Sequence, residues 1–124
     1  MTFRITAKMM DAFNAAQYAE NDKAFAKDLR AYRPDRVQHI SDEELTLVVE
    51  RARELAIQTG IKSPQLRARF VMIDALLIPE FWKDQRLSRL LHSPSGSADV
   101  RFGDVCAAIK RSAFKAGFGR DIWW

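Results

Sequence analysis

Apolar residues in this chain recur at spacings of three and four, which is the pattern of amphipathic helices. The clearest example follows Ser41-Asp42-Glu43-Glu44, a capping box in which the serine accepts from the backbone of Glu44 and the glutamate reaches back. Gly60 ends the apolar stripe as a left-handed C-cap. We therefore predict a helix over residues 42–59. Its stripe consists of Leu45, Val48, Val49, Ala52, Leu55, Ala56 and Thr59.

The next segment is apolar on nearly all of its sides. Ser63-Pro64 supplies an N-cap and a proline at the first helical position, and the pattern continues to Ile78. A helix that is apolar around most of its circumference is usually buried. We therefore predict that residues 64–78 form the central helix of the core. Asp74 is the one carboxylate within it.

Three further segments have helical spacing. The first covers residues 6–32, with Thr6 as its N-cap. Its apolar register weakens at Glu20-Asn21-Asp22, which indicates a kink or a break. The other two segments cover residues 84–92 and 99–116.

These patterns predict an all-α fold. No stretch alternates apolar and polar residues long enough to indicate a strand. Apolar residues make up 48% of the chain and charged residues 29%, which is ordinary for a globular protein. We expect a compact single-domain bundle of four to six helices over residues 1–124, with an aromatic C-terminal tail at 118–124.

The net charge of +4 is unevenly distributed. Residues 1–60 hold 9 basic and 10 acidic side chains, net −1, whereas residues 61–124 hold 11 basic and 6 acidic, net +5. A basic half is typical either of a protein with an acidic partner or of a mildly basic, solvated surface.

The chain lacks the usual signatures of catalysis and metal binding. His39 and His92 have no metal-ligand spacing and are interpreted as surface residues. No nucleophile elbow or phosphate-binding loop occurs. Cys106 is either a core residue or a nucleophile, and we favour the core because it lies on an apolar stripe. We therefore predict a protein that is not an enzyme and binds no cofactor or metal.

Asp74 has two interpretations. A buried carboxylate must be paired or protonated. We favour a structural ion pair, with Arg67, Arg69 or an arginine of another helix, over a catalytic acid.

The chain has no features of an exported or membrane protein. Residues 1–10 carry charges and lack the apolar run of a signal peptide. The longest apolar stretch, residues 70–78, is much shorter than the ~20 residues that a membrane span needs. We expect a cytoplasmic protein.

Residues 55–69 match the skeleton of a bacterial helix-turn-helix, with an alanine, a glycine four residues later and an aliphatic residue six further on. Two observations count against a helix-turn-helix: the first helix is too long for the motif, and the second is apolar nearly all round. DNA binding is therefore the alternative hypothesis, and nucleic acid is not the favoured partner. Its base-facing side chains would be Lys62, Gln65, Arg67 and Arg69.

Several short stretches between residues 3 and 92 are similar to those of one protein family. They are Phe3-Arg4-Ile5-Thr6 leading into Met9-Met10 and Ala12-Phe13, Phe25-Ala26-Lys27-Asp28-Leu29-Arg30 before Arg33-Pro34, Gly60-Ile61-Lys62-Ser63, Ala68-Arg69-Phe70-Val71, and Pro79-Glu80-Phe81-Trp82. The chain resembles small helical accessory proteins encoded in bacterial type VI secretion effector clusters.

The resemblance implies an adaptor, a chaperone or an immunity protein, without catalytic residues. The implied partner is another protein, a secreted effector or toxin or a component of the secretion spike. A homodimer is also left open. The chain departs from the family at Pro79-Glu80, where relatives often carry glycine and acids, and from Ser93 onward, where no counterpart is found.

Two aromatic segments are candidates for binding the partner. Tryptophan and arginine are favoured anchors in protein interfaces. Each segment has an alternative interpretation, which we favour, in which its aromatic side chains cover the core. Truncation after Gly117 distinguishes a docking tail from a core tail. The candidate residues are Phe81, Trp82, Phe118, Arg120, Ile122, Trp123 and Trp124.

Overall fold

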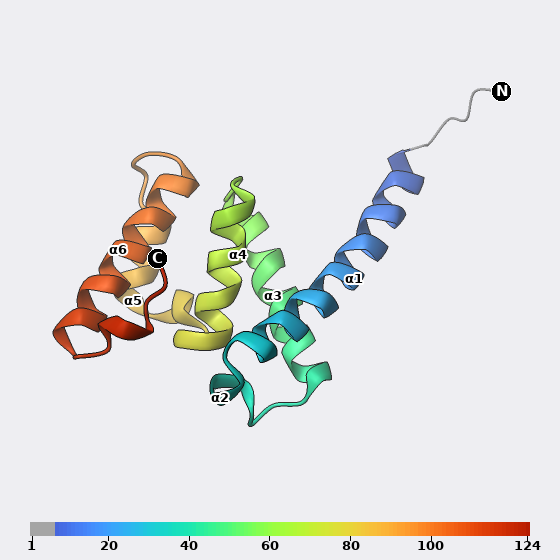
Figure 1. Cartoon of the computed structure of the whole chain (residues 1–124). Helices are drawn as coiled ribbons and strands as arrows, with labels where there is room; N and C mark the ends of the chain where they lie inside the picture. Colours follow the sequence, from blue (N-terminus) through green and yellow to red (C-terminus); the bar gives the residue numbers. More distant parts are fainter. Residues whose placement is uncertain (1–6) are drawn as a thin grey trace.

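The computed structural model confirms the all-α fold (Figure 1). It describes the backbone of residues 7–124 and the side chains from Tyr18 onward, and no strand occurs in that part of the chain. Thr6, the predicted N-cap, lies outside the described residues. The elements are α1 (Ala7–Tyr32), α2 (Pro34–Val37), α3 (Asp42–Thr59), α4 (Pro64–Met72), the π-helical turn η1 (Ile73–Leu77), the 3-10 turn η2 (Phe81–Lys83), α5 (Gln85–Leu91), α6 (Ala98–Lys115) and the 3-10 turn η3 (Gly119–Asp121).

Helix α1 is continuous through residues 20–22, so of the two alternatives for this segment the predicted break is wrong. Asp22 is 4% exposed and accepts hydrogen bonds from the Arg53 guanidinium of α3, with Nε 2.9 Å from Oδ1 and Nη2 3.0 Å from Oδ2. A bidentate arginine satisfies a buried carboxylate. Asp22 therefore occupies a core-facing position without interrupting the helix.

The capping residues of α3 confirm the helix predicted over residues 42–59. The Ser41 hydroxyl accepts from the Glu44 N–H at 3.1 Å. Gly60 adopts φ 96°, and its N–H donates to the last turn of the helix. Each end is thus specified by chemistry within a few residues of the sequence.

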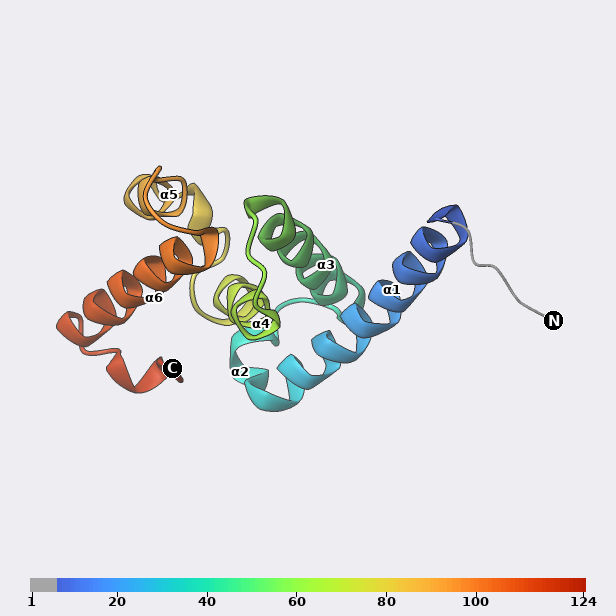
Figure 2. The same ribbon diagram turned by 90° about the horizontal axis from the view of Figure 1, so that it is seen from above.

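Helix α4 is central, but the predicted helix over residues 64–78 is regular only as far as Met72. The next five residues form a π-helical turn, in which the Ile78 N–H donates to the Ile73 carbonyl at 2.9 Å. Seen from above, α4 lies between the α1–α3 pair and the α5–α6 pair (Figure 2). Its two sides therefore face the two halves of the fold.

An aromatic cluster joins α4 to η2 and α6. The Phe70 ring of α4 lies 4.7 Å from that of Phe81 in η2 and 5.4 Å from that of Phe102 in α6. All three side chains are buried. Offset and edge contacts at these distances add to the stabilisation from burying apolar area.

The ends of the chain differ in how they pack. The first part of α1 extends away from the other helices, whereas the C-terminal end returns alongside α6 (Figure 1).

Arg101 holds the α5–α6 connection, because its guanidinium donates to the carbonyls of Leu91 and Gly96 at 2.9 and 2.7 Å. This connection fixes α5 against α6.

We predict that Gly60→Ala lowers the free energy of unfolding by about 1–2 kcal/mol, because an L side chain at φ 96° is strained. Urea denaturation measures the change. Gly103→Ala is the matched control, since its added Cβ meets nothing within 4 Å in the middle of α6. The control should gain about 0.5–1 kcal/mol. Equal effects at both positions would contradict the strain argument.

Candidate functional site

An apolar groove with a volume of about 510 Å³ lies between α5, α6 and the C-terminal tail. Along α6 it follows Ala108, Ser112 and Ala116, three small residues spaced by four. Larger apolar side chains of α6 and of the neighbouring elements also line it. These are Leu77, Ile78, Leu87, Leu90, Ile109, Phe118 and Ile122.

Several of the large apolar side chains that line the groove reach solvent. Phe118 is 61% exposed, Ile78 38% and Leu90 36%. The volume falls within the roughly 300–1,000 Å³ typical of ligand sites. Clustered exposed apolar surface in a folded chain marks a site of interaction more often than scattered residues do.

The end of α6 creates one wall of the groove. Gly117 adopts φ 86°, the Phe118 N–H donates to the Ala113 carbonyl at 2.7 Å, and the Gly117 N–H donates to Phe114 at 3.3 Å. This is a Schellman motif, which reverses the chain after the helix. The Asp121 carboxylate then pairs with Arg36 of α2 at 2.9 Å. The tail is therefore held at both ends, and Phe118 is left at the groove.

The last three residues pack on the body of the protein. The Trp124 Nε1–H donates to the Cys106 carbonyl at 3.3 Å, and Lys110 Nζ donates to the Trp124 carbonyl at 2.7 Å. Trp123 lies edge-on to Trp124, with ring centroids 4.9 Å apart. Both rings are half-buried, as is Ile122, and all three side chains contact the core cluster. Their main contacts are thus inside the fold.

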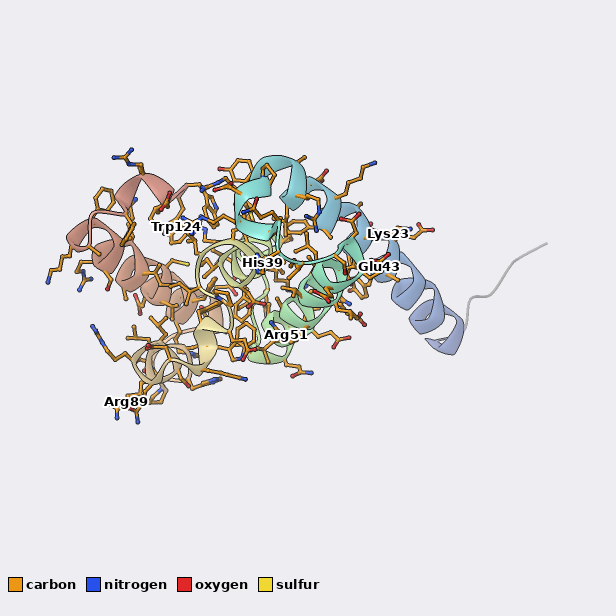
Figure 3. The ribbon with its side chains drawn as sticks, turned by 90° about the horizontal axis from the view of Figure 1, so that it is seen from below. Lys23, His39, Glu43, Arg51, Arg89 and Trp124 are labelled. Carbon is orange, nitrogen blue, oxygen red and sulfur yellow. The ribbon has the colours of Figure 1, made fainter. Side chains whose placement is uncertain are left out.

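Among the predicted partner-binding residues, Phe81 is buried, so its assignment as an exposed anchor is wrong. It is 1% exposed because the aromatic cluster encloses it, so it cannot contact a partner. Trp82 is half-buried and lies beneath the Arg51 guanidinium, 5.3 Å from its ring centroid. Figure 3 places Arg51 and Trp124 on different sides of α4. The structure therefore does not join the tail and the Phe81-Trp82 turn into one surface, and of the seven residues only Phe118 and Arg120 are well exposed.

Asp74 takes part in an ion pair with a residue of another helix. Its side chain is fully buried, and its carboxylate accepts from Arg51 of α3 at 3.1 Å and from the Glu80 N–H at 2.7 Å. Burial raises the pKa of Asp74, against the opposing effects of the Glu80 N–H and of Arg51. Glu80 adopts φ 56° and bonds to Lys83, which lowers the pKa of Glu80. The carboxylate thus fastens α3 to the turn after α4.

Among the described residues, no set of three or more histidine, cysteine or acidic side chains lies close enough together to hold a metal. His39 and His92 are both exposed. Cys106 is buried, and burial raises the pKa of its thiol in spite of the nearby Arg69 guanidinium. A protonated, enclosed thiol is a poor nucleophile.

The helix-turn-helix segment is engaged within the protein. Of its four predicted DNA contacts, Lys62 and Gln65 are exposed. Arg67 instead donates to the Ile61 carbonyl at 2.6 Å, and Arg69 lies over the Trp124 ring at 5.6 Å.

A carboxylate already occupies the end of α4 that would approach DNA. Asp99 of α6 accepts from the backbone N–H groups of Lys62 and Ser63 at 2.7 and 3.1 Å. In a helix-turn-helix, the N-terminal residues of the second helix face the bases and phosphates. A negative charge at this position opposes such an approach, because phosphate would meet Asp99.

No family model, curated protein or solved structure matches this chain. Among the described residues, none of the helices has the length and apolar character needed to cross a membrane. The case for a function therefore rests on the groove and on the chemistry around it.

Sequence patterns did not identify the groove, although they contain part of its signal. The predicted stripe of α6 runs into Ala113 and Ala116, residues too small to fill the space beside a helix. Leu87 and Leu90 form the apolar face of α5, yet Leu90 stays exposed. Where the apolar residues of one helix become small and the facing residues of the next helix stay apolar, the space between the two helices is left unfilled.

The raised pKa of Asp74 predicts how its contribution to stability changes with pH. The folded state binds the proton more tightly than the unfolded chain, whose value is near 3.8. The associated stabilisation is therefore complete below that value and is lost as the pH rises through the folded-state pKa. The unfolding free energy of the wild type minus that of Asp74→Asn should fall as the pH rises across this window. Urea titrations of both proteins at a series of pH values measure it.

Glu80→Gln is the matched control with the opposite sign. Lys83 lowers the pKa of Glu80, so its stabilisation is present above 4.5 and is lost as the pH falls through the folded-state value. If the Asp74 difference instead grew with pH, the Arg51 ion pair would outweigh burial, and the direction given for Asp74 would be wrong.

We predict that Trp124→Ala lowers the free energy of unfolding by about 1–3 kcal/mol, because a half-buried indole and its hydrogen bond to Cys106 are lost. Phe118→Ala, which removes an exposed ring, should change it by less than about 0.5 kcal/mol. Thermal and urea unfolding followed by circular dichroism measure both. If Trp124→Ala changed the free energy of unfolding as little as Phe118→Ala does, Trp124 would not be part of the core.

Proposed function

We propose that this chain is a non-enzymatic accessory protein that binds another protein in the groove between α5, α6 and the tail. The observation that carries the proposal is the groove itself, which is open, mainly apolar and about 510 Å³ in volume. Protein interfaces are typically built around an apolar centre with polar residues at the rim. Phe118 supplies an exposed aromatic anchor at this position.

The sequence resemblance supports a more specific partner. It favours an effector or toxin of a type VI secretion system, or a component of its spike, with the chain acting as adaptor, chaperone or immunity protein. A groove that accepts an apolar segment fits all three roles, because each requires holding one protein against another. The groove offers a single surface on which the partner could bind, whereas most aromatic side chains of the Phe81-Trp82 turn and of the tail pack inside the fold.

The geometry gives no support to the DNA-binding alternative. Arg67 and Arg69 are engaged inside the protein, and Asp99 covers the start of α4. A phosphate-binding surface needs free cations and N–H groups at that helix end. Protein binding through the groove is therefore the function that we propose.

A pair of tryptophan substitutions on α6 tests the proposal. Ser112→Trp places a large ring in the groove, whereas Ala107→Trp places the same ring at an exposed position of α6 away from it. The tagged wild-type chain and both variants are used as baits in the cells that express the chain, with nuclease and high-salt washes, and bound proteins are identified by mass spectrometry. We expect a stoichiometric protein partner with the wild type and Ala107→Trp that is lost with Ser112→Trp.

Affinity measured with the purified partner then gives the size of the effect. Filling the groove should weaken binding by at least about tenfold, which corresponds to 1.4 kcal/mol. Circular dichroism confirms that both variants keep the helical fold. Retention of the partner by Ser112→Trp, or recovery of nucleic acid alone, would refute binding in the groove.

A further inference from the structure

Exposed basic side chains occur on each of the elements that form the groove. Arg86 of α5 lines it, Arg111 and Lys115 lie on α6 near Ser112, and Arg120 lies in η3. All four are exposed, and within the part of the chain that the structure describes none forms an ion pair with a carboxylate. Arg89, at the outer end of α5, adds a further cation to the same half of the molecule (Figure 3).

The acidic side chains of the groove are already engaged. Asp121 pairs with Arg36 at 2.9 Å. Asp84 is the N-cap of α5 and accepts from the backbone N–H groups of Arg86 and Leu87 at 3.0 and 3.1 Å. The charge of Asp121 is thus offset by a cation, and that of Asp84 is stabilised by two backbone N–H groups, whereas the exposed cations have no carboxylate partner among the described residues. The groove therefore presents an apolar surface, and the elements around it carry an excess of these cations.

The dimensions suit one kind of occupant. From Ala108 to Ala116 the groove follows α6 for about 12 Å, at 1.5 Å per residue, which is roughly two helical turns. Amphipathic helices bind such grooves with apolar anchors spaced by three and four residues. A helix with acidic residues on its outer face would meet the exposed cations, and opposite charges within a Debye length of about 8 Å attract at physiological salt.

We propose that the groove binds an acidic amphipathic helix of the partner protein, its apolar stripe along α6 and its carboxylates toward Arg86 and Lys115. This inference rests on the proposed function and adds the chemistry of the segment bound. The basic C-terminal half of the chain then has a role, because its excess charge gathers around the groove where it attracts the partner and sets its orientation.

Selection from a displayed library of random helical peptides, each about four turns long, tests the inference without a known partner. The immobilised full chain serves as target, and Ser112→Trp removes peptides that bind elsewhere. Enriched peptides should carry apolar residues at spacings of three and four and a net negative charge. Their affinity is measured by fluorescence anisotropy at low and high salt.

Charge-reversed variants supply the second measurement. The double variant Arg86→Glu with Lys115→Glu should weaken binding of an enriched peptide by at least about tenfold at low salt, and added salt should reduce the difference. Lys62→Glu is the matched control, because it reverses an exposed charge at the start of α4, away from the groove. It should leave the affinity unchanged.

The other outcomes overturn the inference in distinguishable ways. Peptides that need the open groove but are neutral or basic, or that ignore the charge reversals, would refute the acidic helix and leave the proposed function in place. Failure to enrich any peptide that depends on the groove would count against both. A single-stranded oligonucleotide that displaces the peptides from the wild type would assign the exposed cations to nucleic acid instead.

Discussion

The packing of three phenylalanines joins the central helix of this protein to its C-terminal half. Phe70 comes from the central helix α4, Phe81 from the turn after it, and Phe102 from α6, and their ring centroids lie 4.7 to 6.3 Å apart. Helix α4 has the α1–α3 pair on one side and the α5–α6 pair on the other, and these rings set the position of the α5–α6 pair on α4. The groove lies on the α5–α6 side, so its shape depends on the same contacts.

The buried carboxyl group of Asp74 fixes the turn that leads into this cluster. The π-helical turn at the end of α4 includes Asp74, whose carboxylate accepts the N–H of Glu80 in a left-handed conformation. Phe81 follows at once and enters the core. Such a conformation is strained for a residue other than glycine and persists where its surroundings fix it. The hydrogen bond to Asp74 and the burial of Phe81 supply that constraint.

Local chemistry made much of the fold predictable. The ends of α3 follow from Ser41 and Gly60, whose side-chain and backbone preferences act within one helical turn. Asp22 and Arg53 were beyond such reasoning, because they are 31 residues apart and meet only when α1 packs on α3. The groove was missed for the same reason. Its wall requires the tail to return to α2 through Asp121 and Arg36, and its openness follows from which space stays unfilled in three dimensions.

The ion pair between Asp121 and Arg36 also links segments 85 residues apart across the groove. An occupant of the groove would contact α2, which follows α1, together with α5, α6 and the end of the tail. Unfolding either half of the molecule would then destroy the binding surface. By thermodynamic linkage, any ligand that binds only the folded form raises the stability of the whole fold in proportion to the logarithm of its concentration. The groove thus makes the resistance of this protein to unfolding a direct report of its occupancy.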